Sequence, residues 1–279
     1  MVERALTVFL AGAECPFTCS FCDLWRYTID GPTPPGALPR QIDETLASLD
    51  VSSLARIKLY NASNFFDRRA VPLEDLPRIA ELCGRFGGVT VESHARTIDK
   101  EAVAFARRLE GAGGGRLEVA IGLETIHPRA SADLNKRLDR DRFDRAAAFL
   151  TEHGIDLRVF VLLAVPGIPA AESIEWTVRS AEHAARQGAA LVSIIPLRGG
   201  NGEMERLAGL GLFVPPTLRE LESALEQCIE WKNTVVTVDL WDVERLEACP
   251  ACREQRVERL RRLNLSASAE PPVQCRECQ

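Results

Sequence analysis

Short apolar runs rich in β-branched residues alternate with amphipathic helical segments from residue 5 to about residue 232. This alternation is typical of parallel strands joined by crossover helices, which defines the α/β class. The pattern contains six strand–helix units. The predicted strands are Leu6 to Leu10, Arg56 to Tyr60, Val89 to Ser93, Leu117 to Gly122, Leu157 to Val165 and Leu191 to Pro196.

The helical segments carry apolar residues at the spacing of one helix face. In the clearest case, Ala102, Phe105, Ala106 and Leu109 follow the i, i+3, i+4, i+7 rule. Asp99 is the expected N-cap of this helix, and a glycine at 111 ends it. The same periodicity predicts helices over residues 143–150 and 174–185.

Six units form either an open doubly wound sheet or an incomplete barrel, and strand counting does not separate the two. In both folds, the chemistry lies at the carboxyl ends of the strands. Polar and special residues do follow the predicted strands, at 11–23, 61–64, 93–96, 123–125, 166–167 and 198–200.

A cysteine-rich tail follows the sixth unit. A strand-like run, Val235 to Leu240, leads into it after Lys232. We therefore predict two parts, the strand–helix domain over residues 1–232 and a small C-terminal metal-binding extension over residues 233–279.

Three cysteines stand close together immediately after the first strand. Cys15, Cys19 and Cys22 form a CxxxCxxC loop. Three thiolates hold three irons of a four-iron cluster and leave the fourth iron open, whereas electron-transfer clusters normally use four cysteines. A zinc site is the alternative, and it needs a fourth ligand. His94 could supply that ligand only if the fold brings it close to the three cysteines.

The loop, its place after strand one and the aromatic Phe21 before the third cysteine resemble the radical S-adenosylmethionine (radical SAM) superfamily. The resemblance extends from residue 5 to about residue 200. It implies a partial (β/α)6 TIM-like barrel, a [4Fe-4S] cluster on the three cysteines, and S-adenosylmethionine bound to the open iron. It also implies an electron donor such as flavodoxin or ferredoxin.

The end of strand two departs from the superfamily's usual Gly-Gly-Glu stretch, whose backbone holds the methionine amino group. Here residues 59–67 read LYNASNFFD, which leaves Asn61 and Ser63 as polar substitutes. This variant, together with Glu92 and Ser93 after strand three, is similar to the branch of the archaeosine-biosynthesis radical enzyme. The Elongator-type catalytic subunits are more distant.

The remaining candidate residues follow other strands. In the stretch IGLET, the resemblance implies that Glu124 faces the cofactor ribose, and the Val165-Pro166-Gly167 stretch corresponds to the region near the adenine. Ser93 has a competing role as a helix N-cap. The cofactor-binding candidates are Phe21, Asn61, Ser63, Glu92, Ser93, Glu124 and Arg158; the catalytic candidates are Glu124, His94 and His127.

Two of these assignments have a structural alternative. An arginine fork suits the cofactor carboxylate, but Arg158 opens strand five, and strand starts normally lie at the far rim. His94 and His127 follow strand ends and could donate or accept protons, whereas satisfied structural histidines are commoner.

The tail carries a second cysteine group. Cys249 and Cys252, and Cys275 and Cys278, form two CxxC pairs separated by 22 residues. Four thiolates in two such knuckles suit tetrahedral zinc, but four cysteines also complete an auxiliary iron–sulfur cluster. Both occupants stay open at this stage.

Composition narrows the setting. The 279 residues carry a net charge of −6 with a pI near 5.4, so no basic excess attracts nucleic acid. Nine cysteines without an export signal favour metal ligation in a reducing cytoplasm, and no apolar stretch is long enough for a membrane span. The arginines at 253–262 alternate with Glu254 and Glu258, which predicts a solvated helix face.

The first hypothesis is therefore a radical SAM enzyme, a lyase or a transferase. It would cleave S-adenosylmethionine to a 5′-deoxyadenosyl radical that abstracts hydrogen from a small molecule or modified nucleoside. An alternative is transfer of the 3-amino-3-carboxypropyl group, for which the altered strand-two stretch leaves room. A second alternative is a metal-bearing module in which the tail arginines bind tRNA.

Overall fold

The computed structural model describes residues 2–278. The chain divides into two compact units. The first unit comprises the residues up to 18 together with 22–122 and 141–157. The second unit comprises 19–21, 123–140 and the residues from 158 onwards.

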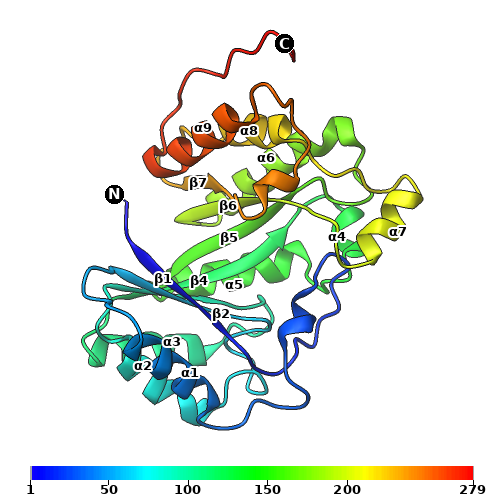
Figure 1. The fold of residues 1–279 in the computed structure, drawn as a ribbon. Helices are drawn as coiled ribbons and strands as arrows, with labels where there is room; N and C mark the ends of the chain where they lie inside the picture. The colour runs from blue at the N-terminus through cyan, green and yellow to red at the C-terminus, as the bar shows by residue number, and fades with distance from the viewer. Residues whose placement is uncertain (1, 279) are drawn as a thin grey trace. The chain divides into compact units, whose positions relative to one another are not determined.

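The first unit is built on four parallel strands that pair in chain order. Amphipathic helices cover one face of these strands with their apolar sides. Figure 1 shows α1, α2 and α3 side by side against this face. The strands are β1 (Ala5–Leu10), β2 (Arg56–Asn61), β3 (Gly88–Glu92) and β4 (Arg116–Glu124); the helices are α1 (Ala37–Ala47), α2 (Leu76–Cys83), α3 (Lys100–Gly111) and α5 (Arg140–Glu152).

Side chains alternate along β2 because successive residues of a strand point to opposite faces. Ile57 and Leu59 are fully buried, whereas Lys58 and Tyr60 on the opposite face are half-buried. β2 therefore has one face fixed by the core and the other available to polar side chains, whereas nearly every residue of β3 and β4 is buried.

The second unit continues the same construction. Its strands β5 (Asp156–Leu163), β6 (Leu191–Pro196) and β7 (Val235–Val238) are parallel and again follow chain order. In Figure 1, α8 and α9 lie beside each other next to β7. The helices of this unit are α4 (Ala130–Asp133), α6 (Ser173–Arg186), α7 (Glu203–Gly209), α8 (Leu218–Glu226) and α9 (Arg253–Ser266); single 3₁₀ turns in the chain are η1 (Leu24–Tyr27), η2 (Leu73–Asp75), η3 (Ala170–Glu172) and η4 (Val243–Arg245).

The predicted fold class is confirmed. All six predicted strands are present, and Asp99 caps α3 by accepting a hydrogen bond from the Glu101 N–H at 2.8 Å. The strands run in chain order within each unit, as in a singly wound partial barrel, without the reversal that marks a doubly wound sheet. The strand-like run predicted after Lys232 is β7, and it pairs with β6.

Side-chain amides satisfy the backbone at both outer strands. Gln41 of α1 accepts from the Ala11 N–H at 2.9 Å and donates to the Ala11 carbonyl at 3.0 Å, just beyond β1. Asn264 of α9 does the same for Val238 of β7, at 2.9 and 2.8 Å. Both edges are thereby closed to pairing with another chain at these residues. Among residues 2–278, no helix has the length and apolar character needed to cross a membrane.

Candidate functional site

The chain leaves β1 through a closely packed turn that leads into the cysteine loop. A Cβ at Gly12 would lie 2.8 Å from Oγ1 of Thr33, so only glycine fits there. The Thr33 hydroxyl accepts from the Ala13 N–H and donates to the Ala70 carbonyl, each at 2.8 Å. The proline-rich segment around Thr33 thus fixes the start of the cysteine loop.

Asn64 connects Cys15 to the segment after β3. Nδ2 of Asn64, which follows β2, donates to the Cys15 sulfur at 3.3 Å, and Oδ1 of Asn64 accepts from the His94 N–H at 2.8 Å. The ring of Phe17, inside the loop, stacks on the His94 ring with centroids 4.0 Å apart. The structure therefore brings His94 to the cysteine loop.

The Cys22 thiol lies in the same unit, in surroundings that disfavour its ionised form. Burial raises the pKa of Cys22, the Leu24 backbone N–H opposes this, and the negative charges of Cys15, Asp23 and Glu92 raise it further. Glu92, at the end of β3, is therefore close to the loop. An adjacent metal is the natural means of keeping such a thiol deprotonated.

Asn61 and Ser63 have buried side-chain polar atoms without a hydrogen-bond partner in the part of the chain that the structure describes. Asn61 ends β2 and is only 4% exposed. Within the described residues 2–278, neither polar atom of its side chain nor the buried Oγ of Ser63 has a hydrogen-bond partner. Buried polar groups are normally paired, so these atoms are the expected position of a bound polar ligand.

Ser93, a predicted cofactor-binding residue, forms hydrogen bonds within the protein. Its hydroxyl accepts from the Phe66 N–H at 3.2 Å and lies 2.8 Å from the Thr97 hydroxyl. It is not the cap of α3, which is Asp99. Ser93 therefore holds the segment after β2 against the end of β3.

The middle of the cysteine loop is anchored in the second unit. The Ser20 N–H donates to the Leu134 carbonyl at 3.0 Å, and Asn201 donates to the Ser20 carbonyl at 2.7 Å. Phe21 packs against an apolar cluster that includes Leu134, Leu162 and Met204. Phe21 thus fixes the loop residues next to Cys19 by packing.

Glu124 ends β4 in a left-handed backbone conformation, with φ of 65°. Its carboxylate is buried and forms an ion pair with Lys136. The neighbours of this lysine, Asn135 and Arg137, also have positive φ, at 52° and 56°. Backbone strain of this kind collects at functional sites, where the surrounding structure must hold it.

Sequence reasoning missed Lys136. The residue lies outside any periodic segment, and only its opposite charge to Glu124, 12 positions earlier, could have indicated the pair.

Two other predicted residues have different surroundings. Nδ1 of His127 accepts from the Ala130 N–H at 3.1 Å, and its ring packs edge-on against Trp176 at 4.5 Å. These contacts account for His127 as a structural residue. Arg158 is the third residue of β5, about 17 Å along the strand from its carboxyl end. The structure therefore does not bring Arg158 to the strand ends.

The four tail cysteines converge as predicted. Their sulfur atoms all lie within 4.8 Å of one another. The Cys249 and Cys275 sulfurs are 3.9 Å apart, and those of Cys252 and Cys278 are 3.5 Å apart. A single metal ion at their centre would have four thiolate ligands, so this group can bind metal.

Two buried arginines of α9 lie beside this cysteine group. Arg256 donates to the Cys252 sulfur at 3.1 Å and to the Cys278 sulfur at 3.8 Å, and it forms an ion pair with Glu222 of α8. Arg259 is 2% exposed and pairs with Glu222 at 3.1 Å and with Glu226 at 2.6 Å. The prediction of a solvated helix face is wrong for these two arginines, because α8 and the tail segment cover them.

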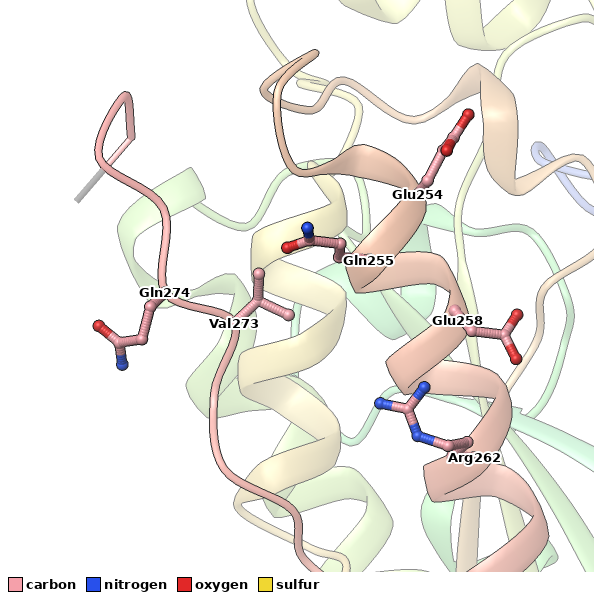
Figure 2. A pocket seen from close by; sticks show the side chains of 6 residues that line it. All are labelled: Glu254, Gln255, Glu258, Arg262, Val273 and Gln274. Atoms are coloured by element: carbon pink, nitrogen blue, oxygen red, sulfur yellow. The ribbon is translucent and has the colours of Figure 1, made fainter.

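A shallow hollow of about 470 Å³ lies beside α9. Figure 2 shows Val273 of the tail segment facing Gln255 of α9, Gln274 pointing away from the helix, and Glu254, Glu258 and Arg262 projecting from the helix. None of the predicted site residues lines it. The hollow reflects the path of the tail across α9, which brings Cys275 and Cys278 back to the first CxxC pair.

Comparison with solved structures places this arrangement in a known fold. SuiB of Streptococcus suis bound to S-adenosylmethionine matches with a TM-score of 0.59 at 14% identity, over 90% of this chain and 55% of that chain. Coproporphyrinogen III oxidase HemN of Escherichia coli, a radical SAM enzyme, matches with a TM-score of 0.52 at 10% identity, over 81% and 52%. The chain shares the fold of these two enzymes.

Elp3 of the archaeon Methanocaldococcus infernus also matches this fold, with a TM-score of 0.59 at 13% identity over 95% of this chain and 64% of that chain. This chain spans about half the length of the SuiB chains that it matches. No family model and no curated protein matches the sequence. The comparisons thus establish the fold, whereas the chemistry depends on the residues of this chain.

Proposed function

We propose that this chain is a radical SAM enzyme in which Cys15, Cys19 and Cys22 hold a [4Fe-4S] cluster that cleaves S-adenosylmethionine reductively. When bound, the cluster supplies one electron, received from a donor such as flavodoxin or ferredoxin, to break a carbon–sulfur bond and release methionine and a 5′-deoxyadenosyl radical. The radical then takes a hydrogen atom from the substrate, giving 5′-deoxyadenosine.

One observation carries this proposal: Asn61 and Ser63, after β2, have buried polar atoms that find no hydrogen-bond partner among residues 2–278, and they belong to the unit that holds Cys15 and Cys22. The methionine part of S-adenosylmethionine carries an ammonium and a carboxylate. An amide oxygen can accept a hydrogen bond from the ammonium group, and amide N–H and hydroxyl groups can donate to the carboxylate. The residues present therefore fit this cofactor, although the usual Gly-Gly-Glu stretch is absent.

The remaining residues have assigned roles by the superfamily resemblance. We assign Glu124 to a hydroxyl of the cofactor ribose, with Lys136 holding its carboxylate in place. Glu92 stands beside the cysteine loop, where its carboxylate faces cofactor or substrate. His94 positions the loop through Phe17 and Asn64, and no step is assigned to His127 or Arg158.

We assign a planar substrate, such as a modified nucleoside, to the face of β1 and β2 that carries Phe9 and Tyr60. Phe9 of β1 is 72% exposed, and its ring centroid lies 6.4 Å from that of Tyr60 on β2. Exposed aromatic rings on a sheet face offer a stacking surface for a base. The net charge of −6 favours a small molecule over whole tRNA, and the similarity to the archaeosine branch points to the same class.

The product of S-adenosylmethionine cleavage tests the reaction. Anaerobically reconstituted, dithionite-reduced protein is incubated with S-adenosylmethionine and analysed by mass spectrometry. We expect 5′-deoxyadenosine, and none from a variant with all three loop cysteines changed to alanine. Methylthioadenosine would instead indicate 3-amino-3-carboxypropyl transfer. Absence of both products from cluster-loaded protein would overturn the proposal.

For the tail, over residues 233–279, we propose a single zinc ion. Four thiolates at about 2.3 Å from a tetrahedral zinc are about 3.8 Å apart, close to the 3.9 and 3.5 Å between paired sulfurs here. A cubane attaches each thiolate to a different iron and needs a wider spacing. One zinc and about four irons per purified chain is the expected composition; about eight irons without zinc would favour an auxiliary cluster.

The arginines of α9 argue against the tRNA-binding alternative. Arg256 and Arg259 are buried against Glu222, and Arg262 pairs with Glu270 at 3.0 Å. A salt-dependent mobility shift with tRNA at micromolar protein would restore that alternative.

A further inference from the structure

We propose that Asn64 sets the reduction potential of the cluster by donating a hydrogen bond to the sulfur of Cys15. This inference depends on the proposed function only in that the loop must hold an iron–sulfur cluster. Sequence reasoning had no role for Asn64, because an asparagine in a loop most often stabilises a turn.

The orientation of the Asn64 amide follows from its partners. Oδ1 accepts a hydrogen bond from the His94 backbone N–H at 2.8 Å, and a backbone N–H can only donate. The other end of the amide must therefore be Nδ2, and it lies 3.3 Å from the Cys15 sulfur. In the flipped orientation, Nδ2 would face the His94 N–H, and both groups are donors. Oδ1 would face the Cys15 thiolate, and both groups are acceptors.

The backbone around Asn64 is held as firmly as the side chain. The Phe65 N–H donates to the Glu92 carbonyl at 2.9 Å, and the Phe66 N–H donates to Ser93 Oγ at 3.2 Å. Phe65 is 1% exposed and packs on Phe105 of α3, with ring centroids 5.0 Å apart. Asn64 itself is 4% exposed, so water does not compete for its N–H. The donor is thus prepositioned at the sulfur.

A prepositioned donor acts on the cluster through charge. Reduction adds one negative charge that is shared with the ligating sulfurs, and a hydrogen bond to a thiolate stabilises that charge more in the reduced than in the oxidised state. Hydrogen bonds to the sulfurs are among the factors that set the potentials of such clusters. The Asn64 amide therefore raises the potential and makes the electron easier to accept.

Two variants test this role. Asn64→Leu removes the donor without adding charge; Asn64→Asp keeps an oxygen for the His94 N–H but turns a carboxylate oxygen toward the sulfur. At fixed potential, we expect the ratio of reduced to oxidised cluster to fall about tenfold in Asn64→Leu, which equals about 59 mV for one electron. The fall in Asn64→Asp should be larger, because its charge repels the added electron.

Gln41→Leu is the matched control. It also replaces a side-chain amide that hydrogen-bonds at the start of the same loop, but its partner is the Ala11 backbone and not a sulfur. We expect it to leave the potential unchanged. Iron content and far-UV circular dichroism show whether each variant is folded and loaded.

A measurement on the unmodified chain covers the case in which the variants do not load. With ¹⁵N-asparagine labelling, electron–nuclear double resonance of the reduced cluster should show a coupled ¹⁵N nucleus and its exchangeable proton. Unchanged potentials in loaded Asn64 variants, or no such coupling in the unmodified protein, would overturn the inference. Absence of 5′-deoxyadenosine alongside shifted potentials would overturn only the proposed function.

Discussion

Substitution of Glu222 by glutamine tests how α9 and the tail are held against α8. The Glu222 carboxylate, on α8, is buried and pairs with two buried guanidiniums of α9, Arg256 and Arg259. Glutamine has nearly the same shape as glutamate but no charge. Its side-chain NH2 group would face a guanidinium N–H, and both are donors. The change therefore removes one member of a buried ion network and leaves the packing in place.

The expected cost follows from what each arginine keeps. Breaking a buried ion pair by removing one partner costs about 3–5 kcal/mol, because a charge is left buried without its counter-charge. Arg259 retains Glu226 at 2.6 Å and the carbonyls of Glu270 and Pro271, whereas Arg256 retains its hydrogen bonds to the sulfurs of Cys252 and Cys278. We therefore expect about 3 kcal/mol, at the lower end of this range.

Thermal and urea unfolding, followed by tryptophan fluorescence, measure this cost. For a chain of this size, about 3 kcal/mol corresponds to a fall in Tm of about 6–12 °C. Glu258→Gln on α9 is the matched control, because its pair with Arg261 is more than half exposed and contributes about 0.5 kcal/mol or less. If Glu222→Gln and Glu258→Gln unfold within about 1 kcal/mol of each other, the buried network does not hold the tail as reasoned.

Three further predictions concern the metal site, the Glu124 pair and a buried thiol. Cys249→Ser should abolish zinc binding while the iron bound by the front loop is retained, and metal analysis of both elements checks this; unchanged zinc would contradict the tetrahedral site. Lys136→Met should destabilise the chain by about 3 kcal/mol or more by stranding the Glu124 carboxylate, and the double variant with Glu124→Gln should recover most of that loss in urea unfolding; additive losses would refute the coupling. Burial raises the pKa of Cys83 to about 12, so its contribution to stability is complete below the unfolded thiol's pKa near 9 and is lost as pH rises toward 12, by about 1.4 kcal/mol per unit. The unfolding free energy of the unmodified chain should therefore fall between pH 8 and pH 10 by about 1.4 kcal/mol more than that of Cys83→Ala, and equal falls would contradict this.

The fold was predictable because its signals are local. A strand buried on its helix side reads as apolar and β-branched, as at Ile57 and Leu59 in β2, and the cap at Asp99 is a short-range hydrogen bond. The convergence of the tail cysteines was predictable for a similar reason, since each CxxC pair is a local knuckle and metal chemistry demands four ligands.

The supports of the candidate site could not be predicted, because they join residues that are far apart in the sequence and carry no periodic signal. Asn64 meets Cys15 across 49 positions, and Glu222 meets Arg259 across 37. The arginines of α9 alternate with glutamates in the way that solvated helices do, so composition alone favoured an exposed face. Burial against α8 is a tertiary property, and it places arginines in the interior that the sequence pattern assigns to an exposed face.

Two kinds of buried polar group in this chain lead to different conclusions. In the tail, Arg256, Arg259 and Glu222 satisfy one another and the cysteine sulfurs, which is the pattern of a structural network. After β2, residues 2–278 provide no hydrogen-bond partner for the side-chain atoms of Asn61 or the hydroxyl of Ser63. Each such group costs about 1–3 kcal/mol when left unpaired, against a total stability of about 5–15 kcal/mol. A ligand that hydrogen-bonds to these atoms would remove that cost, which is why the proposed function assigns Asn61 and Ser63 to a polar cofactor.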